Sequence, residues 1–180
     1  VDGIERHPTL NRLIGFRDQG PNRDMACHGS ESGNLATLDL SEASDRVSLQ
    51  LVGLLTAPHA SLNEGVMACR SRTAEVPGYG VITLSKYASM GSALTFPLEA
   101  MVFLTIVFCG IEKQMKTQMT EETVQSLLGQ VRVYGDDIII PTEYACCVID
   151  TLESFGLKVN VSKSFWTGRF RESCGGDYYS

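Results

Sequence analysis

The amino-acid sequence predicts an α+β fold in which an antiparallel sheet carries helices packed on one face. Residues 131–140 read V-R-V-Y-G-D-D-I-I-I, where two runs rich in β-branched residues flank a Gly-Asp turn, as in a tight hairpin. Around this hairpin, strand-like and helix-like runs follow one another in the order strand, helix, strand hairpin, helix, strand. That order is typical of an antiparallel sheet covered by helices.

Composition fits one globular domain. The chain has 180 residues, 43% of them hydrophobic, which is enough for a sizeable core. Its six cysteines include no C-x-x-C pair and no signal-peptide pattern is present, so reduced thiols are expected. The formal charge of −6 argues against a free-standing nucleic-acid binder, which usually carries a basic face. A polynucleotide partner would therefore require metal ions or basic segments elsewhere.

The first elements are predicted from loop residues and apolar spacing. Residues 1–33 are polar and rich in Gly, Pro and Ser, so little regular structure is expected there. Residues 35–40 read as a short buried strand. A helix should follow, with Ser44 as its N-cap and Asp45 at the positive end of its dipole, and it should end before Pro58. Its apolar positions at helical spacing are Val47, Leu51, Leu54 and Leu55.

The later elements are predicted in the same way. Residues 60–76 should be partly helical, and 81–84 should form a strand. Apolar residues that recur every three or four positions predict a long helix over 95–115, although its most apolar stretch is too short to span a bilayer. Further elements are expected as a short helix after Thr120, a helix over 143–155 ended by Gly156, and strands over 157–161 and 164–166.

Asp136 and Asp137 give the central hairpin its chemical interest. Two like charges on one tight turn repel each other, so either water covers them or a divalent cation lies between them. Gly-Asp turns are also common at solvated surfaces. Asp39 ends a strand predicted to be buried, where it would coordinate a ligand or cap residues 41–42. If that strand pairs beside the hairpin, Asp39 and Asp136 can bridge two Mg²⁺ ions, as in nucleotidyl transfer.

Three short runs follow one another along the chain, and their order matters for the assignment. They are D-L-S-E-A-S-D at 39–45, M-G-S-A-L-T-F at 90–96 and Y-G-D-D at 134–137. They resemble motifs A, B and C of viral RNA-dependent RNA polymerases. More closely, the chain resembles the replicase β-subunits of the leviviruses, the positive-strand RNA bacteriophages. Two more stretches similar to that family are D-Q-x-P-N at 18–22 and F-R-E-S-C-G at 170–175.

The resemblance implies the palm of a right-hand polymerase, with small parts of the fingers at about 1–33 and 57–90. Such replicases carry most of the fingers and the thumb on either side of this segment. The chain also lacks an initial methionine and stops at 178–180 in what reads as an ordered element. We therefore expect residues 1–180 to be a single palm domain and a fragment of a longer protein.

The resemblance also implies roles for the acidic residues. Asp39 and Asp136 would be the principal metal ligands, with Asp137 as a weaker ligand or a local charge. Asp45 would face the ribose of the incoming nucleotide, a role compatible with that of a helix N-terminal acid. The remaining residues expected to bind the nucleotide are Gly91, Ser92, Thr95 and Glu99, the last at a position where many polymerase families have asparagine and levivirus replicases share the glutamate.

Three basic residues are further candidates. Lys163 matches the lysine of motif D, which the wider family is thought to use as the general acid for pyrophosphate. Lys158 competes for this role, and a plain surface lysine is the alternative. Arg169 and Arg171 lie in the last predicted hairpin, where they would contact RNA phosphates or simply be solvated.

The expected function is templated transfer of ribonucleotides from NTPs to an RNA 3′-hydroxyl, with two Mg²⁺ ions or Mn²⁺ in their place. The resemblance implies as partners template and product RNA, host elongation factors Tu and Ts and a ribosomal protein, in the cytoplasm of the infected bacterium and with no membrane. The isolated fragment would be inactive.

Two alternatives stay open. A reverse transcriptase palm can share the Y-x-D-D hairpin, but it typically has an aromatic residue at the ribose-facing position, where this chain has Asp45. A non-catalytic RNA-binding module on a split βαβ sheet would stack bases on aromatic residues of its central strands, and this hairpin offers only Tyr134 among aliphatic residues.

Overall fold

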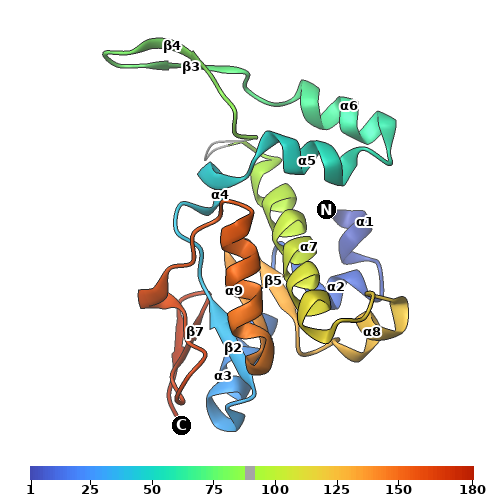
Figure 1. The fold of residues 1–180 in the computed structure, drawn as a ribbon, viewed down its shortest axis with the longest axis vertical. Coiled ribbons are helices and arrows are strands. Elements are labelled where there is room, and N and C mark those ends of the chain that lie inside the picture. The colour runs from blue at the N-terminus through green and yellow to red at the C-terminus, as the bar shows by residue number, and fades with distance from the viewer. Residues whose placement is uncertain (88–91) are drawn as a thin grey trace.

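A computed structural model of the chain describes residues 1–87 and 92–180. Its centre is a four-stranded sheet (Figure 1), with the strands in the order β1 (Ile14–Gly15), β5 (Arg132–Tyr134), β6 (Asp137–Pro141) and β2 (Leu35–Leu38). Strands β5, β6 and β2 pair antiparallel, whereas β1 pairs parallel with β5. The α+β class is therefore confirmed, with one short parallel pair added at an edge.

Helices cover both faces of this sheet. Helices α7 (Thr95–Met115) and α9 (Ala145–Ser154) pack against each other over one face, and α3 (Gly20–Ser32) contacts the other (Figure 1). Successive strand residues point to opposite faces. Ile138 and Ile140 accordingly join the core under α7 and α9, while Ile139 packs with Ala26 of α3. The expectation of helices on one face only is wrong, because β6 is apolar on both faces and needs cover on both.

Helix α3 also corrects the expectation that residues 1–33 have little regular structure. Its buried residues are small or polar, namely Asn22, Ala26, Gly29 and Ser30. A Cβ at Gly29 would lie 3.0 Å from the Cβ of Leu35, so the helix approaches β2 very closely. This helix is buried through small side chains rather than an apolar stripe, and apolar periodicity therefore could not reveal it.

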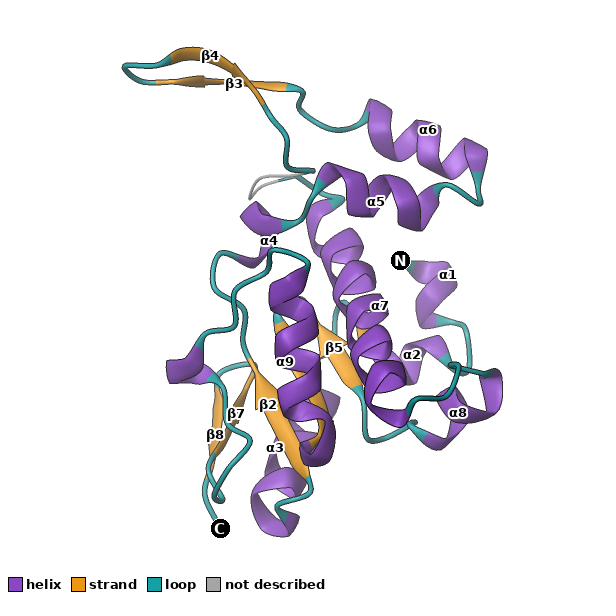
Figure 2. Cartoon of the chain, in the orientation of Figure 1, coloured by secondary structure: helices purple, strands orange, loops and turns teal. Residues whose placement is uncertain are grey.

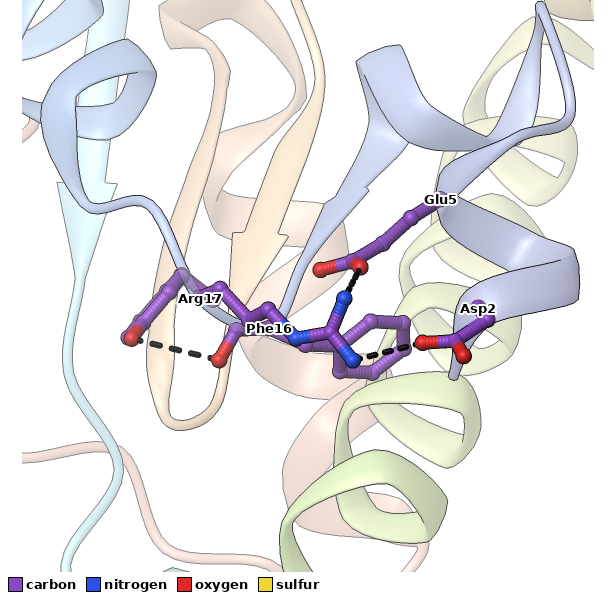
Figure 3. Close-up of polar contacts among 5 residues, drawn as sticks. Asp2, Glu5, Phe16 and Arg17 are labelled. Carbon is purple, nitrogen blue, oxygen red and sulfur yellow. Dashed lines mark hydrogen bonds and ion pairs between the residues drawn. The ribbon is translucent and has the colours of Figure 1, made fainter.

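Helix α1 (Asp2–Glu5) and helix α2 (Leu10–Leu13) precede β1. The guanidinium of Arg17 reaches back to α1, where its nitrogens lie 2.5 Å from the carboxylates of Asp2 and Glu5 (Figure 3). The hydrogen bond from Arg17 lowers the pKa of Asp2. Arg17 and Asp2 are solvent-exposed and Glu5 is partly buried, so these pairs contribute little to stability, and they join α1 to the segment that follows β1.

The predicted helix after residue 43 is broken in two. Helix α4 (Ala43–Arg46) ends at the buried Val47, and Ser48 then caps helix α5 (Leu49–Thr56) by accepting a hydrogen bond from the N–H of Gln50 at 3.1 Å. The break arises because Val47 is extended and its carbonyl oxygen binds the N–H of Tyr87 at 2.9 Å. Ser44 is therefore not the cap of the long helix, and Asp45 lies in a separate short one.

Beyond α5 come α6 (Ala60–Ala68) and a hairpin of β3 (Thr73–Val76) and β4 (Gly80–Thr83), which extends away from the central sheet (Figure 2). The long helix over 95–115 is confirmed at both ends, and Gly156 follows α9 with a φ of 83°. The expected strands over 157–161 and 164–166 form only single bridges to Leu40 and Thr37. Other short elements are α8 (Glu121–Ser126), the 3₁₀ turns η1 (Thr142–Tyr144) and η2 (Val161–Lys163), and strands β7 (Arg171–Ser173) and β8 (Gly176–Tyr178).

Helix α7 is the central element of the core. By length and composition it could cross a membrane, and it is the one helix of the described residues that could. Most of that apolar stretch is buried inside the molecule, against α9 and the sheet. Its apolar character is therefore explained by its place in the core.

Candidate functional site

The turn of the central hairpin places Asp136 at the tip of the β5–β6 pair. Tyr134 and Asp137 form the closing pair, so Gly135 and Asp136 are the two loop residues. Gly135 has a φ of 59°, and a Cβ there would lie 2.4 Å from a ring carbon of Phe96. Glycine is needed for both reasons, the left-handed backbone and the close approach of the ring. The hairpin tip is thereby packed against the start of α7.

Asp39 lies at the same end of the sheet. Leu38 pairs with Ile138, and Asp39 is the next residue, beside the acidic turn. Its carboxylate accepts a hydrogen bond from the side-chain amide of Asn160 at 3.0 Å. Ser41, which an Asp39 cap would have served, donates its N–H to the carbonyl oxygen of Lys158 at 2.8 Å. The carboxylate of Asp39 is therefore oriented by Asn160 rather than used as a local cap.

Burial and mutual repulsion act on both acids. Burial raises the pKa of Asp39, and the charges of Asp136 and Asp137 raise it further, whereas the hydrogen bond from Asn160 and the charge of Lys163 lower it. Burial also raises the pKa of Asp136, with a smaller contribution from the charge of Asp137. Both pKa values lie above the usual range because negative charge is concentrated where water is partly excluded. A cation bound between the carboxylates would relieve this cost.

Lys163 is the lysine that affects these acids. Its positive charge lowers the pKa of both Asp39 and Asp136, and no such effect of Lys158 is found on either acid. Lys163 lies in η2, the turn that directly follows Asn160. One short segment therefore supplies both the hydrogen-bond partner of Asp39 and this positive charge. Lys163 is thus better placed than Lys158 for the expected role.

Asp136 opens onto a pocket of about 540 Å³ between the residues before α5 and the start of α7. Four of the residues expected to bind a nucleotide line it, together with Asp136. The complete lining is Glu42, Ala43, Ser44, Asp45, Ser92, Thr95, Phe96, Glu99 and Asp136. The fold therefore brings part of each of the three runs to one cavity, whereas Asp39 is not among the lining residues that the structure describes. Gly91 falls outside the described residues.

Glu99 is the most perturbed acid in this pocket. Its side chain is buried, and burial together with the charge of Asp136 raises its pKa to about 7. Its Oε2 atom finds no hydrogen-bond partner among the described residues. Buried polar atoms in proteins are nearly always paired, so an unpaired one on a pocket wall is open to a ligand.

Asp137 points elsewhere. It shares the strand face of Ile139, which is the α3 side of the sheet. Its Oδ1 accepts hydrogen bonds from the hydroxyl of Ser173 and the N–H of Cys174, both at 3.0 Å. Within the described part of the chain, no group of three or more acidic, His or Cys side chains is arranged to hold a metal ion. Mg²⁺ usually takes one or two carboxylates, with waters and substrate phosphates as the other ligands, so Asp39 and Asp136 fit its chemistry.

The two arginines expected at RNA have structural partners. Arg171 is fully buried and donates to the carbonyl oxygens of Leu35 at 2.5 Å and Phe170 at 2.6 Å. Arg169 donates to the carbonyl oxygen of Glu31 at the end of α3. The burial of Arg171 does not support a contact with RNA phosphates, because its guanidinium is enclosed by backbone.

Several residues of the site were missed by sequence reasoning. Phe96 lines the pocket and packs edge-on against Tyr134, with ring centroids 5.2 Å apart. Glu42 lines the pocket with a φ of 53°. Arg132 is buried and bonds the Asn22 side chain at 3.0 Å, which explains the asparagine of the run D-Q-x-P-N. Phe96 and Glu42 lie inside runs already singled out, so their positions beside Thr95 and Asp45 were the available signals.

Comparison with known proteins identifies a family. Residues 7–180 match the family model described as RNA replicase, beta-chain. The chain is 37% identical over 179 residues to the RNA-directed RNA polymerase subunit beta of Qbeta virus (strain MX1), which covers 99% of this chain and 28% of that protein. It is 39% identical over 179 residues to the RNA-directed RNA polymerase beta chain of Enterobacteria phage fr, covering 99% of this chain and 30% of the relative.

The beta chain of Escherichia phage MS2 is similarly related, at 39% identity over 166 residues, covering 92% of this chain and 28% of that protein. The chain thus spans less than a third of the length of these relatives. The family model nevertheless matches nearly all residues of the chain, which is enough to establish membership of the family. The chain belongs to the RNA replicase β-chain family.

Proposed function

We propose that this chain forms the catalytic palm of an RNA-directed RNA polymerase that replicates the genome of an RNA phage. The observation that carries the proposal is the pocket in which Asp136 meets Asp45, Ser92, Thr95 and Glu99. Its volume lies within the range of small-molecule sites, and its polar groups converge from three separate elements. The names of the relatives, RNA-directed RNA polymerases of RNA phages, support the same function.

Asp39 and Asp136 are the residues that would hold the metal ions, Mg²⁺ or Mn²⁺. When bound, two such ions supply charge neutralisation at the phosphates and activation of the attacking 3′-hydroxyl. The chain's own contribution is orientation, because Asn160 holds the carboxylate of Asp39 and the Gly135 turn places Asp136 at the tip of the hairpin. Lys163, whose charge acts on both acids, would hold the proton that passes to the leaving pyrophosphate.

The other pocket residues would bind the nucleotide. Asp45 would accept a hydrogen bond from the ribose 2′-hydroxyl, which is the group that distinguishes RNA from DNA precursors. Ser92 and Thr95 offer hydroxyl groups at the start of α7, and Glu99 offers its unpaired Oε2. Gly91 would allow close approach of the backbone to the substrate.

An RNA template and an RNA product are the partners that follow from this function, inside the infected bacterium. Elongation factors Tu and Ts, a ribosomal protein and a cytoplasmic location remain predictions from the family resemblance. The overall negative charge of the chain, −6, means that most of the attraction for RNA phosphates would come from metal ions and from other parts of a polypeptide of the relatives' length.

The test is Asp136→Asn in a polypeptide of the relatives' full length that carries these 180 residues. The amide keeps the shape of the side chain but removes the charge next to the metal. We expect primer extension to fall by about 10²–10³-fold or more, the scale of losing one electrostatic group that acts on the transition state. Asp177→Asn, an exposed acid on β8, is the matched control and should leave extension unchanged.

Normal extension by Asp136→Asn would contradict the proposal. Measuring kcat/KM for rNTPs and dNTPs with the unsubstituted protein separates the two polymerase classes. A clear preference for dNTPs would replace the proposal by a reverse transcriptase.

A further inference from the structure

The turn between β7 and β8 has an unusual backbone. Ser173 pairs with Gly176, so Cys174 and Gly175 are the two loop residues, and their φ angles are 50° and 70°. Positive φ at both loop positions is typical of a type I′ turn, which normally selects Asn, Asp or Gly there. Cys174 has a side chain that disfavours this conformation, so surrounding contacts must hold it in place.

Two charged side chains hold the peptide groups of Cys174. The N–H of Cys174 donates to Oδ1 of Asp137 at 3.0 Å, and the hydroxyl of Ser173 donates to the same oxygen at 3.0 Å. Arg23 of α3 donates through Nε and Nη2 to the carbonyl oxygen of Cys174, at 3.1 and 2.8 Å. Hydrogen bonds to ionised groups are about twice as strong as neutral ones. The turn is thus fixed from both sides.

Asp136 and Asp137 therefore have different surroundings although they are adjacent. Asp136 lines the nucleotide-sized pocket. Absence from that lining does not by itself set Asp137 apart, because among the described residues Asp39 is absent from it as well. Asp137 is instead bonded to the β7–β8 turn on the opposite side of the sheet. A displacement of that turn would be transmitted through a single peptide bond to Asp136, at the tip of a two-residue loop.

We infer that Asp137 is a positioning residue, whose carboxylate holds the Ser173–Gly176 turn against the end of β6, while metal binding rests on Asp39 and Asp136. The consequence for catalysis rests on the proposed function. The contact itself does not, because it joins two hairpins whether or not the chain polymerises RNA.

Two substitutions distinguish the role of Asp137 as a hydrogen-bond acceptor from its role as a negative charge. Asp137→Asn keeps a carbonyl oxygen that can accept both hydrogen bonds, but it removes the negative charge. Asp137→Ala removes the acceptor and the charge together. A positioning role predicts that Asn substitutes for Asp and Ala does not, whereas a ligand role predicts that both variants fail.

The contact is measured directly on the 180-residue chain. The thiol of Cys174 is buried, and burial together with the charge of Asp137 raises its pKa to about 12, so it should react slowly with a maleimide, unlike the exposed Cys69. Because Asp137 also acts on the thiol through its charge, exchange of the Cys174 N–H is the deciding readout. Mass spectrometry reads the labelling of each cysteine separately, and hydrogen exchange reports on the N–H of Cys174. We expect Asp137→Ala to speed labelling and exchange at Cys174 by about tenfold, the effect of losing one or two hydrogen bonds.

The controls are Asp137→Asn, in which the Cys174 N–H should exchange within about threefold of its rate in the unsubstituted chain, and Asp177→Asn on the same hairpin, expected to be unchanged. Equal exchange of the Cys174 N–H in Asp137→Ala and the unsubstituted chain would overturn the inference. If Asp137→Ala fails to fold, Ser173→Ala provides the second test, because it removes one of the two hydrogen bonds to Oδ1 of Asp137 and leaves the charge in place. Unchanged exchange of the Cys174 N–H in Ser173→Ala would then overturn it.

The activity arm uses a polypeptide of the relatives' full length. We expect Asp137→Asn to retain primer extension within about tenfold, whereas Asp136→Asn loses it. If Asp137→Asn is as inactive as Asp136→Asn while Cys174 stays protected, Asp137 acts through its charge and the inference is wrong. If the unsubstituted protein extends no primer, the proposed function fails, and the exchange of the Cys174 N–H still decides the contact.

Discussion

On the α7 side of the central sheet the buried Glu99 and the half-buried Asp136 line a pocket, whereas on the α3 side the buried guanidinium groups of Arg132 and Arg171 bond mainly to backbone carbonyl oxygens. Burial raises the pKa of Asp136 and Glu99 on the first side and lowers the pKa of Arg132 and Arg171 on the second. On both sides burial disfavours the charged form of the side chain. On the α3 side most guanidinium nitrogens donate to protein oxygens, although Nη2 of Arg171 is buried without a partner among the described residues. On the α7 side Oε2 of Glu99 lies without such a partner on the wall of a pocket. Burial thus shifts the pKa on both sides, so a shifted pKa alone does not identify a functional side chain.

The largest effect is expected on the α3 side. Arg171→Ala would leave the carbonyl oxygens of Leu35 and Phe170 without their donor and would open a cavity, at a cost of about 3–5 kcal/mol in the free energy of unfolding. Urea unfolding measures this cost, with the exposed Arg169→Ala as the control, expected to change it by under about 1 kcal/mol.

RNA binding by Arg171→Ala tests the opposite interpretation, in which Arg171 contacts RNA phosphates. If Arg171 contacted phosphates, its removal would flatten the dependence of RNA affinity on salt by about one unit of slope. Full stability of Arg171→Ala together with a flatter salt dependence would restore the interpretation based on sequence. Arg171 would then be a functional residue, and the contrast between the two sides of the sheet would no longer hold.

The next effect is the dependence of stability on pH, from the α7 side. The pKa of Glu99 is about 7 in the folded chain and 4.5 in the unfolded one, so the folded state binds more protons between these values. Stability must therefore fall as the pH rises from about 4.5 to about 7, by at most about 3 kcal/mol for this group. The raised pKa values of Asp39 and Asp136 act in the same direction.

Glu99→Gln should remove the part of this slope that lies between about pH 5 and 7. The measurement is urea unfolding at several pH values in the presence of a chelator, so that no divalent ion is bound. Glu64→Gln on the exposed face of α6 is the matched control. A slope that is identical in Glu99→Gln and the unsubstituted chain would show that Glu99 titrates normally.

The smallest effect is stabilisation by divalent ions. A ligand at ten times its dissociation constant stabilises a protein by about 1.4 kcal/mol. Millimolar Mg²⁺ or Mn²⁺ should therefore raise the melting temperature of the chain, and removal of the ion by a chelator should reverse the increase. Asp39→Asn should reduce it, because one of the two carboxylates loses its charge. If neither ion changes the melting temperature, the non-catalytic RNA-binding module would be favoured.

Local elements were predictable where one pattern dominates. The apolar repeat of 95–115 and the Gly-Asp turn at 135–136 gave the long helix and the hairpin correctly. Helix α3 was missed because close packing through Gly29 and Ala26 leaves no apolar stripe. The local sequence favours Ser44 as the cap of a longer helix, because the break at Val47 depends on a hydrogen bond from the distant Tyr87.

The chemistry of the site followed a similar division. Runs 39–45, 92–96 and 134–137 predict a nucleotide site, because residue types and their order along the chain are properties of the sequence, and the structure brings part of each run to one pocket. Only the tertiary structure decided which face each side chain takes. It directed Asp136 to the pocket and Asp137 to the β7–β8 turn, and it enclosed Arg171 in backbone carbonyls. The physical reason is that burial and hydrogen-bond partners come from segments far apart in sequence, which no local pattern specifies.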